Sequence, residues 1–492
     1  MSIKKGHIIN EHCPVKGELV EYNGLVYSCT LNQTEIDANK NKFYIMQLIK
    51  NGSSYTLFII YGRISEHGKP LTTTLSDEAS GRSAFEKQFK AKTGNVFGTK
   101  SFVKKPNKYF LSDVSYEEDL QKADIPKEIK VPESKLDKRV QDLVKMLTNT
   151  SEMEKAMVSL NIDTKKMPLG KIKASQLDLA KDVLDKIETL INDKDTETSK
   201  YVDMSNQFYT YLPMASTGRR KLAVIDNNEI IQKYKDMITD LKNIVVTVQI
   251  KENVKIDENP IDSIYNGINT TITSVDKQSN IWKNIESYIK TTHGPTHQPK
   301  LELIELFEVS QHGKKVAFDK YCEKIGNRQL LYHGTGMMNI VSIFKNGMYL
   351  DPSKIDSNIH ITGKMFGNGI YYADCATKSF NYCKSDASND IGTMILSEVA
   401  LGKQYERINA ENVTQSTLNT KKCNSTKGVG KYVALDENAV NIYDNVKIPM
   451  GPLKMANKNN TLLYNEHILY NTDAFLIKYL AIVKNVGGKS NY

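Results

Sequence analysis

The C-terminal fold is indicated by a short stretch of sequence, Leu330-Leu331-Tyr332-His333-Gly334-Thr335. Apolar residues run up to His333, which is the pattern of a buried strand, and Gly334 follows at the expected strand end. Glycine has no Cβ and therefore lets backbone groups approach a ligand closely. A His-Gly pair alone is more typical of a structural histidine, so the neighbouring motifs decide whether this strand carries a site.

Two later motifs add chemistry to this strand. The first is Gly367-Asn368-Gly369-Ile370-Tyr371-Tyr372-Ala373-Asp374, which is followed by Lys378-Ser379-Phe380-Asn381-Tyr382-Cys383. It has no third glycine at the spacing of a Rossmann fold, so we reject that fold, and Gly428-Val429-Gly430 fails the same test. The second is Leu462–Tyr470, where Glu466 interrupts a strand-like apolar run. Taken alone, such a carboxylate is usually solvent-facing; the alternative is a recessed acid that orients a sugar hydroxyl.

Composition sets the broad class of the protein. The chain has 492 residues, of which 40% are hydrophobic and 25% charged, so we expect an ordinary globular protein of roughly three domains. The net charge of +9 is spread along the chain and does not by itself indicate a nucleic-acid-binding tail. The sequence contains no run of about 18 apolar residues, so we expect no membrane-spanning helix. The N-terminus does not resemble a secretory signal. The six cysteines form no Cys-x-x-Cys pair, so we expect reduced thiols and no zinc.

Hydrophobic periodicity changes along the chain and predicts a multidomain α+β protein. Short β-branched and aromatic runs at 43–49 and 55–61 flank Asn51-Gly52, a hairpin signal, and a helix is expected at about 84–92. Apolar residues then repeat every three or four positions, which indicates amphipathic helices, before strand patterns return. The predicted regions are an N-terminal tail at 1–20, a β-rich domain at 21–112, a linker at 113–133, an all-α domain at 134–290 and an α+β domain at 291–492.

Together these motifs resemble the poly(ADP-ribose) polymerase family. The family's catalytic His-Tyr-Glu signature maps onto His333, Tyr371 and Glu466. The resemblance implies a WGR domain at 21–112, an autoinhibitory helical regulatory domain at 134–290 and an ADP-ribosyltransferase catalytic domain at 291–492. That order without zinc fingers is similar to the short, DNA-dependent members. The supporting matches are Leu31–Thr34, Asn41–Leu48, Tyr61–Arg63, Lys92–Asn95, Val140–Leu147, Met167–Lys171, Asn206–Thr210, Met365–Tyr371, Ser397–Gly402 and Lys427–Lys431.

The resemblance implies transfer of ADP-ribose from NAD⁺, used as a substrate and without a metal, to protein side chains and to a growing polymer. Nicotinamide would leave through an oxocarbenium-like state at the ribose. Glu466 would bind the ribose 2′-hydroxyl and polarise the acceptor. The implied NAD⁺-binding residues are His333, Gly334, Thr335, Asn339, Tyr371, Ser379 and Tyr382. The implied acceptor subsite comprises His297, Met365, Lys378, Leu463 and Tyr464.

The resemblance also implies partners. These are DNA with 5′-phosphorylated strand breaks, protein acceptors including the protein itself, and an accessory protein that completes the active site in parts of the family. A nuclear or otherwise DNA-associated location and a role in the DNA damage response follow from the same likeness, and no membrane partner is expected. The implied DNA-binding residues are Asn41, Lys42, Tyr61, Gly62, Arg63, Lys92 and Tyr109.

Two other functions stay open on the sequence. One is a mono-ADP-ribosyltransferase or NAD⁺ glycohydrolase, which would use the same site with a different outcome. The other is a non-catalytic scaffold that binds DNA ends. Intact His333, Tyr371 and Glu466 argue against the scaffold, since it needs none of them.

Overall fold

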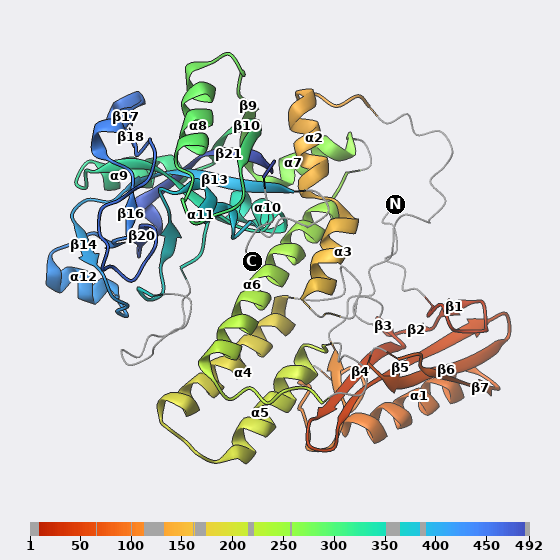
Figure 1. Cartoon of the computed structure of the whole chain (residues 1–492). Helices are drawn as coiled ribbons and strands as arrows, with labels where there is room; N and C mark the ends of the chain where they lie inside the picture. Colours follow the sequence, from red (N-terminus) through yellow and green to blue (C-terminus); the bar gives the residue numbers. More distant parts are fainter. Residues whose placement is uncertain are drawn as a thin grey trace. The chain divides into compact units, whose positions relative to one another are not determined.

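The structure is a computed structural model that describes residues 9–64, 66–99, 101–112, 132–160, 162, 174–214, 221–255, 258–350, 365–383 and 390–487 (Figure 1). The chain forms two compact units. The first comprises residues 1–130 and 150–249, and the second comprises 131–149 and 250–492. Of the predicted linker 113–133, only 132–133 are described, and the segment Met167–Lys171 lies outside the described residues.

An antiparallel sheet dominates the first unit. Its strands lie in the order β7-β6-β5-β4-β8, with β1 paired to β5. The register pairs Asn51 with Ser54, which confirms the hairpin predicted at Asn51-Gly52. A separate ribbon consists of β2 (Glu21–Tyr22) and β3 (Leu25–Val26). The sheet strands are β1 (Glu18–Leu19), β4 (Ser28–Glu35), β5 (Lys40–Asn51), β6 (Ser54–Arg63), β7 (Lys69–Leu75) and β8 (Phe110–Ser112).

Helix α1 (Glu78–Thr93) covers one face of this sheet (Figure 1). It begins earlier than the predicted 84–92 because Asp77 caps it, its side chain accepting a hydrogen bond from the Ser80 backbone N–H. It ends at Gly94, as predicted. Phe85 and Phe89 are fully buried and pack into the aromatic and aliphatic core of the sheet.

Four helices complete the first unit. Their buried faces follow the predicted spacing, for example Leu177, Ala180, Leu184 and Ile187 on α4. Helix α5 contacts the sheet, since the backbone N–H of Ile36 donates to Asn206 Oδ1 at 2.7 Å. The helices are α3 (Thr150–Ser159), α4 (Ala174–Asn192), α5 (Thr198–Tyr211) and α6 (Asn228–Glu252), whose last residues belong to the second unit.

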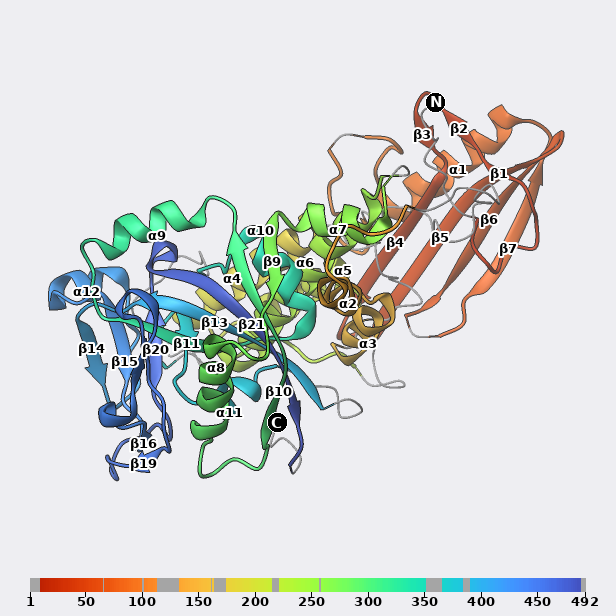
Figure 2. The same cartoon turned by 90° about the horizontal axis from the view of Figure 1, so that it is seen from above.

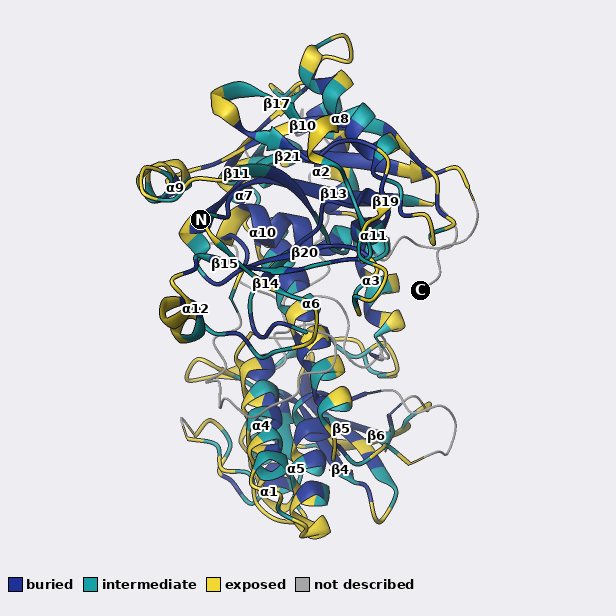
Figure 3. Cartoon of the chain, turned by 60° about the vertical axis from the view of Figure 1, so that its left-hand side comes forward, coloured by how far each residue is buried: buried dark blue, intermediate teal, exposed yellow. Residues whose placement is uncertain are grey.

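Two sheets form most of the C-terminal α+β region of the second unit. The larger has the order β17-β18-β11-β13-β21-β10-β9, and β10, β13 and β21 lie side by side in both views (Figures 1 and 2). Strands β13 and β21 are almost entirely buried (Figure 3). The strands are β9 (Thr270–Ser274), β10 (Leu301–Gln311), β11 (Arg328–Gly334), β13 (Ile391–Ala400), β17 (Val440–Asn441), β18 (Lys447–Ile448) and β21 (Phe475–Asn485).

The smaller sheet has the order β12-β20-β15-β14 and carries two of the three motifs. Tyr332 on β11 forms a reciprocal pair of backbone hydrogen bonds with Ala373, both 2.9 Å, and this bridge joins the two sheets. The strands are β12 (Ile370–Tyr372), β14 (Gln404–Arg407), β15 (Ser425–Gly428) and β20 (Glu466–Leu469), and β16 (Tyr432–Val433) pairs separately with β19 (Lys454–Met455). The helices of this region are α8 (Asn280–Thr291), α9 (Lys314–Cys322), α10 (Ile340–Asn346), α11 (Ala376–Phe380) and α12 (Gln415–Lys421).

Parts of the predicted all-α domain pack with the second unit. Helix α2 (Lys138–Leu147) and helix α7 (Pro260–Ile268) belong to it, and Arg139 Nε donates to Glu305 at 2.7 Å. Strand β9 pairs with β10, and α8 packs on the same sheet. Residues 270–290 therefore join the C-terminal fold, whereas the sequence places them in the helical domain.

The multidomain α+β class is confirmed. None of the helices in the described ranges combines the length and apolar character needed to cross a membrane. All six cysteines are free thiols. Within the same described ranges, no cluster of three or more His, Cys, Asp or Glu side chains is arranged to hold a metal ion.

The packing of α1 generates a prediction about stability. Replacing Phe85 by Ala leaves a cavity between helix and sheet, and we expect a loss of about 3 kcal/mol in the free energy of unfolding. Chemical denaturation followed by circular dichroism measures this loss. Lys87→Ala, on the exposed side of the same helix, is the control and should change the transition little. Equal effects of the two variants would contradict the packing described for α1.

Candidate functional site

The bridge between the two sheets brings His333, Tyr371 and Glu466 to one site. His333 ends β11, and its Nδ1 lies 2.9 Å from the backbone oxygen of Tyr371 on β12. Tyr371 pairs with Ile468 on β20, the strand that begins with Glu466. The three residues that the sequence singles out thus come from three strands linked by backbone hydrogen bonds.

His333 is held as a neutral ring. Its Nδ1–H donates to the Tyr371 carbonyl, so Nε2 has a lone pair and can accept a hydrogen bond. Burial lowers the pKa of His333 below its ordinary value and outweighs the hydrogen bond to Tyr371, which acts in the opposite direction. A neutral imidazole whose Nε2 can accept a hydrogen bond suits a sugar hydroxyl as partner.

Tyr371 is fixed by its own hydroxyl group. The hydroxyl donates to the Gly367 carbonyl at 2.8 Å and accepts from the Phe366 backbone N–H at 3.0 Å. Gly367 has φ +80°, a left-handed conformation that favours glycine, so the Gly-x-Gly motif serves this turn rather than a dinucleotide fold. Burial raises the pKa of Tyr371 well above its ordinary value, so the phenol is neutral.

Glu466 forms an ion pair with Lys378. The Lys378 Nζ lies 2.7 Å from Glu466 Oε1, and both side chains are 14% exposed. The same ammonium donates to the backbone oxygen of Tyr464 at 3.2 Å. The sequence-based interpretation places Lys378 in the acceptor subsite, and the structure places it directly on the carboxylate.

Gly334 meets helix α11 at very short range. A Cβ atom at this position would lie 1.7 Å from the backbone oxygen of Ser379, so no side chain fits. Ser379 is buried, whereas Tyr382 is 60% exposed. Thr335 Oγ1 accepts a hydrogen bond of 3.0 Å from Asn339 Nδ2. The residues predicted to bind NAD⁺ therefore lie on β11, β12 and α11 and in the segments that directly follow β11 and α11.

Tyr464 and His297, two other residues of the predicted acceptor subsite, lie near Lys378. The Tyr464 ring lies 4.7 Å from the ring of His297, whose Nδ1 lies 2.8 Å from Thr377 Oγ1. Burial, with smaller contributions from His293 and Lys378, lowers the pKa of His297 to about 4. Leu463 is 42% exposed, and Met365 is partly buried against the smaller sheet.

In the first unit, the predicted DNA-binding residues gather at one end of strands β5 and β6. Lys42 and Arg63 are directly paired, and Tyr61 stacks on Tyr44 with ring centres 5.8 Å apart. Lys92 lies over the Tyr44 ring at 4.7 Å, and Tyr109 contacts the same ring. Gly62 lies between Tyr61 and Arg63 on β6.

Two of these residues already have partners within the unit. Arg63 donates to the backbone oxygen of Asn39 at 2.6 Å and to its side-chain oxygen at 2.9 Å. Asn41 is buried, and its Nδ2 donates to the Met214 carbonyl at 3.0 Å. A DNA contact by the side chain of Asn41 stays a prediction.

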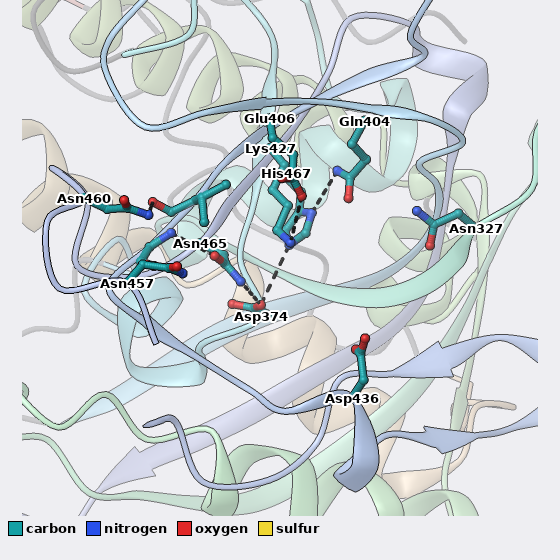
Figure 4. Close-up of polar contacts among 12 residues, drawn as sticks. Asn327, Asp374, Gln404, Glu406, Lys427, Asp436, Asn457, Asn460, Asn465 and His467 are labelled. Atoms are coloured by element: carbon teal, nitrogen blue, oxygen red, sulfur yellow. Dashed lines mark hydrogen bonds and ion pairs between the residues drawn. The ribbon is translucent and has the colours of Figure 1, made fainter. Parts of the chain in front are cut away.

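Three polar residues next to Glu466 were missed by the sequence reasoning. Asp374, Asn465 and His467 are buried and contact one another on the smaller sheet (Figure 4). Asp374 ends the second motif and the other two flank Glu466, so their position in the motifs was the available signal.

The close approach at Gly334 generates a second prediction. Gly334→Ala forces β11 away from α11, and we expect a loss of about 2 kcal/mol or more in the free energy of unfolding. Gly326→Ala is the matched control, because a Cβ there meets nothing within 4 Å. Thermal melting of both variants tests this difference. A melting temperature for Gly334→Ala as high as that of the control would show that the described contact is wrong.

Comparison with known proteins gives matches over most of the chain. Residues 279–485 match the poly(ADP-ribose) polymerase catalytic domain, residues 134–265 match the poly(ADP-ribose) polymerase regulatory domain, and residues 27–104 match the WGR domain. The three domains occur in the predicted order.

Individual relatives agree with these domain matches. The chain is 35% identical to poly [ADP-ribose] polymerase 1 of Gallus gallus over 474 residues, which is 94% of this chain and 46% of the relative. It is 33% identical to human poly [ADP-ribose] polymerase 2, covering 93% of this chain and 79% of the relative. It is 31% identical to poly [ADP-ribose] polymerase 2-A of Oryza sativa, covering 92% and 69%.

The length of the match differs between these relatives. The chain spans about half the length of poly [ADP-ribose] polymerase 1 of Gallus gallus. It spans more than two thirds of the length of human poly [ADP-ribose] polymerase 2 and of polymerase 2-A of Oryza sativa. With the His-Tyr-Glu residues assembled on one site and three domain matches in order, the chain belongs to the poly(ADP-ribose) polymerase family.

Proposed function

We propose that this protein is an NAD⁺-dependent poly-ADP-ribosyltransferase that DNA strand breaks activate. The observation that carries the proposal is the placement of Glu466, paired with Lys378, beside His333 and Tyr371. The matches to the family's catalytic domain and to relatives named poly [ADP-ribose] polymerase support the choice of NAD⁺ as substrate. Protein side chains, including the protein's own, are the proposed acceptors.

The site would hold the nicotinamide end of NAD⁺ between aromatic walls. Tyr371 supplies one wall and Tyr382 the other, a favourable contact for a cationic ring. The Gly334 backbone and the Ser379 hydroxyl would hydrogen-bond the carboxamide. His333, neutral and with Nε2 free to accept, would bind a ribose hydroxyl, while Thr335 and Asn339 line the adenosine side. Fixing the donor in this way raises the fraction of bound NAD⁺ that is oriented for reaction.

Transfer breaks the bond between ribose C1′ and the nicotinamide nitrogen, which leaves with the bonding electron pair. The acceptor oxygen then forms the new bond to C1′. Glu466 would hold the ribose 2′-hydroxyl and polarise the acceptor hydroxyl by accepting its hydrogen bond. Lys378 places its ammonium beside this carboxylate, with Nζ 2.7 Å from Oε1. His297, Met365, Lys378, Leu463 and Tyr464 are the proposed contacts for the acceptor, and a carboxylate at this place favours elongation over single transfer.

DNA would bind to the end of the sheet in the first unit. Lys42 and Arg63 form a directly paired basic couple, and the stacked Tyr61 lies beside them with Lys92 and Tyr109 close by. A guanidinium can grip phosphate oxygens with two donors. The helical domain would restrain the catalytic domain until DNA binds, in line with the regulatory-domain match. We propose a DNA-associated, nuclear location on the same grounds.

Glu466→Gln is the first test of the activity. With labelled NAD⁺, the natural protein should give a ladder of products on a gel. We expect the variant to lose the ladder by more than about a hundredfold, because the amide cannot accept the acceptor proton. Glu302→Gln, an exposed position on β10, is the control and should keep the ladder. A single band from the natural protein would instead indicate mono-transfer, and free ADP-ribose alone a glycohydrolase.

Arg63→Ala tests the activation. A nicked DNA with a 5′-phosphate should stimulate the natural protein, and we expect Arg63→Ala to weaken the apparent affinity for this DNA by about tenfold or more. The same DNA with a 5′-hydroxyl is the matched ligand, and its affinity should depend less on Arg63. The measurement is activity against DNA concentration at a fixed salt concentration, since salt weakens phosphate contacts. Equal responses to both DNAs would rule out the phosphate contact.

A further inference from the structure

A buried polar cluster lies behind the catalytic strand (Figure 4). Successive side chains on a strand point to opposite faces, so Asn465 and His467 face away from the side on which Glu466 meets Lys378. Both contact Asp374, and all three side chains are nearly inaccessible, with exposures of 5% for Asp374, 4% for Asn465 and 3% for His467.

One carboxylate oxygen contacts the residue on each side of Glu466. Asn465 Nδ2 donates to Asp374 Oδ2 at 2.7 Å. His467 Nε2 lies 3.8 Å from the same oxygen, beyond hydrogen-bond distance, and is buried without a hydrogen-bond partner among the described residues. Asp374 therefore hydrogen-bonds the residue immediately before the catalytic carboxylate and faces the residue immediately after it.

Each of these two side chains is also tied to a neighbouring segment. Asn465 Oδ1 accepts from the Gly430 backbone N–H at 2.9 Å. His467 Nδ1 lies 3.1 Å from Gln404 Nε2 on β14, so the imidazole accepts from that amide and its Nε2–H points at Asp374. The cluster thus connects the Glu466 strand to two adjacent parts of the smaller sheet.

Asp374 carries a charge in this buried place. Burial alone would raise the pKa of Asp374, but its interactions with His467 and Asn465 and the charge of Lys427 outweigh burial, and the pKa lies below its ordinary value. Burying an ionised group is costly, and an apolar residue of similar volume would often serve stability as well. Within the described residues, the second oxygen, Oδ1, is buried without a hydrogen-bond partner, so the group is not optimised for stability alone.

In the chain, Asp374 lies between two elements that carry residues of the site. It closely follows Tyr371 on β12 and directly precedes the short helix α11, which carries Lys378 and Ser379. The contacts of Asp374 with the neighbours of Glu466 therefore connect β20, which carries Glu466, to the segment that leads into α11, which carries Lys378.

We propose that Asp374 is a positioning residue for the transferase reaction, holding Asn465 and His467 so that Glu466 lies in the geometry needed for polymer elongation. The inference rests on the proposed function of Glu466. Asp374 touches neither donor nor acceptor in this proposal and acts only through its two partners. Buried groups of this kind, which orient the residues that contact a substrate, often matter for activity by one or two orders of magnitude.

The test compares Asp374→Asn with Glu398→Gln. Both replace a buried carboxylate in the same unit, but Glu398 pairs with Arg328 and has no contact with β20 among the described residues. We expect Asp374→Asn to lower the elongation rate by about tenfold or more, while the KM for NAD⁺ changes by less than about threefold. Glu398→Gln should leave product length unchanged even where it lowers the melting temperature. Equal product lengths from natural protein and Asp374→Asn would overturn the proposal.

A double variant separates positioning from a general structural effect. If Asp374 acts through Glu466, adding Asp374→Asn to Glu466→Gln should cause no further loss of elongation, since the two changes remove one function. A further loss equal to that of Asp374→Asn alone would overturn the proposal. Where Asp374→Asn does not fold, His467→Phe replaces it, because it removes one partner and leaves the Asn465 contact; unchanged elongation in that variant would likewise overturn the proposal. A natural protein that forms no ADP-ribose products would refute the proposed function itself, which is a distinct result.

Discussion

The pair of backbone hydrogen bonds between Tyr332 and Ala373 is the constraint on which the site depends. It joins the edge of the smaller sheet to β11 of the larger one. His333 follows Tyr332 directly, and its hydrogen bond to the Tyr371 carbonyl continues the same connection. This junction connects the sheet that carries His333 to the sheet that carries both Tyr371 and Glu466. With it, their spacing is set by backbone geometry rather than by flexible side chains.

Opposite charges are distributed on the two faces of β20. On one face, Glu466 meets the ammonium of Lys378, and both side chains are largely buried. On the other face, Asp374 meets His467 and lies in the field of Lys427. Because side chains alternate along a strand, the carboxylate on β20 and the carboxylate that packs against its other face lie in separate environments. This separation allows one acid to serve chemistry while the other maintains position.

Much of this arrangement could be predicted from the sequence, and the failures have physical reasons. His333, Tyr371 and Glu466 were singled out because the motifs around them resemble the family's signature, whereas the local pattern alone favoured a structural histidine and a solvent-facing carboxylate. Asp374 and His467 were not singled out, because the sequence pattern of a buried polar residue that has a polar partner is the same as that of an exposed polar residue. The Lys378–Glu466 pair joins distant segments, so no local pattern reports it.

The boundary of the helical domain and one predicted DNA-binding residue show the same limit. Helix α8 has the period of a bundle helix, and only the pairing of β9 with β10 reveals that this part of the chain packs on the C-terminal sheet. Asn41 was placed among the DNA contacts from its neighbours, yet its side chain is buried and bonded to the Met214 carbonyl. The sequence shows how apolar and polar residues alternate along a strand, but it does not show which face of that strand a distant helix covers.

The turn before β5 links two properties of the first unit. Asn39 accepts both hydrogen bonds of Arg63, the proposed phosphate-binding residue. Close by in the chain, the Ile36 N–H donates to Asn206 on α5, and Asn41 donates to Met214 just beyond that helix. The hydrogen bonds of one short turn therefore connect the Arg63 guanidinium and the α5 segment to the same few residues, 36–41, of the first unit.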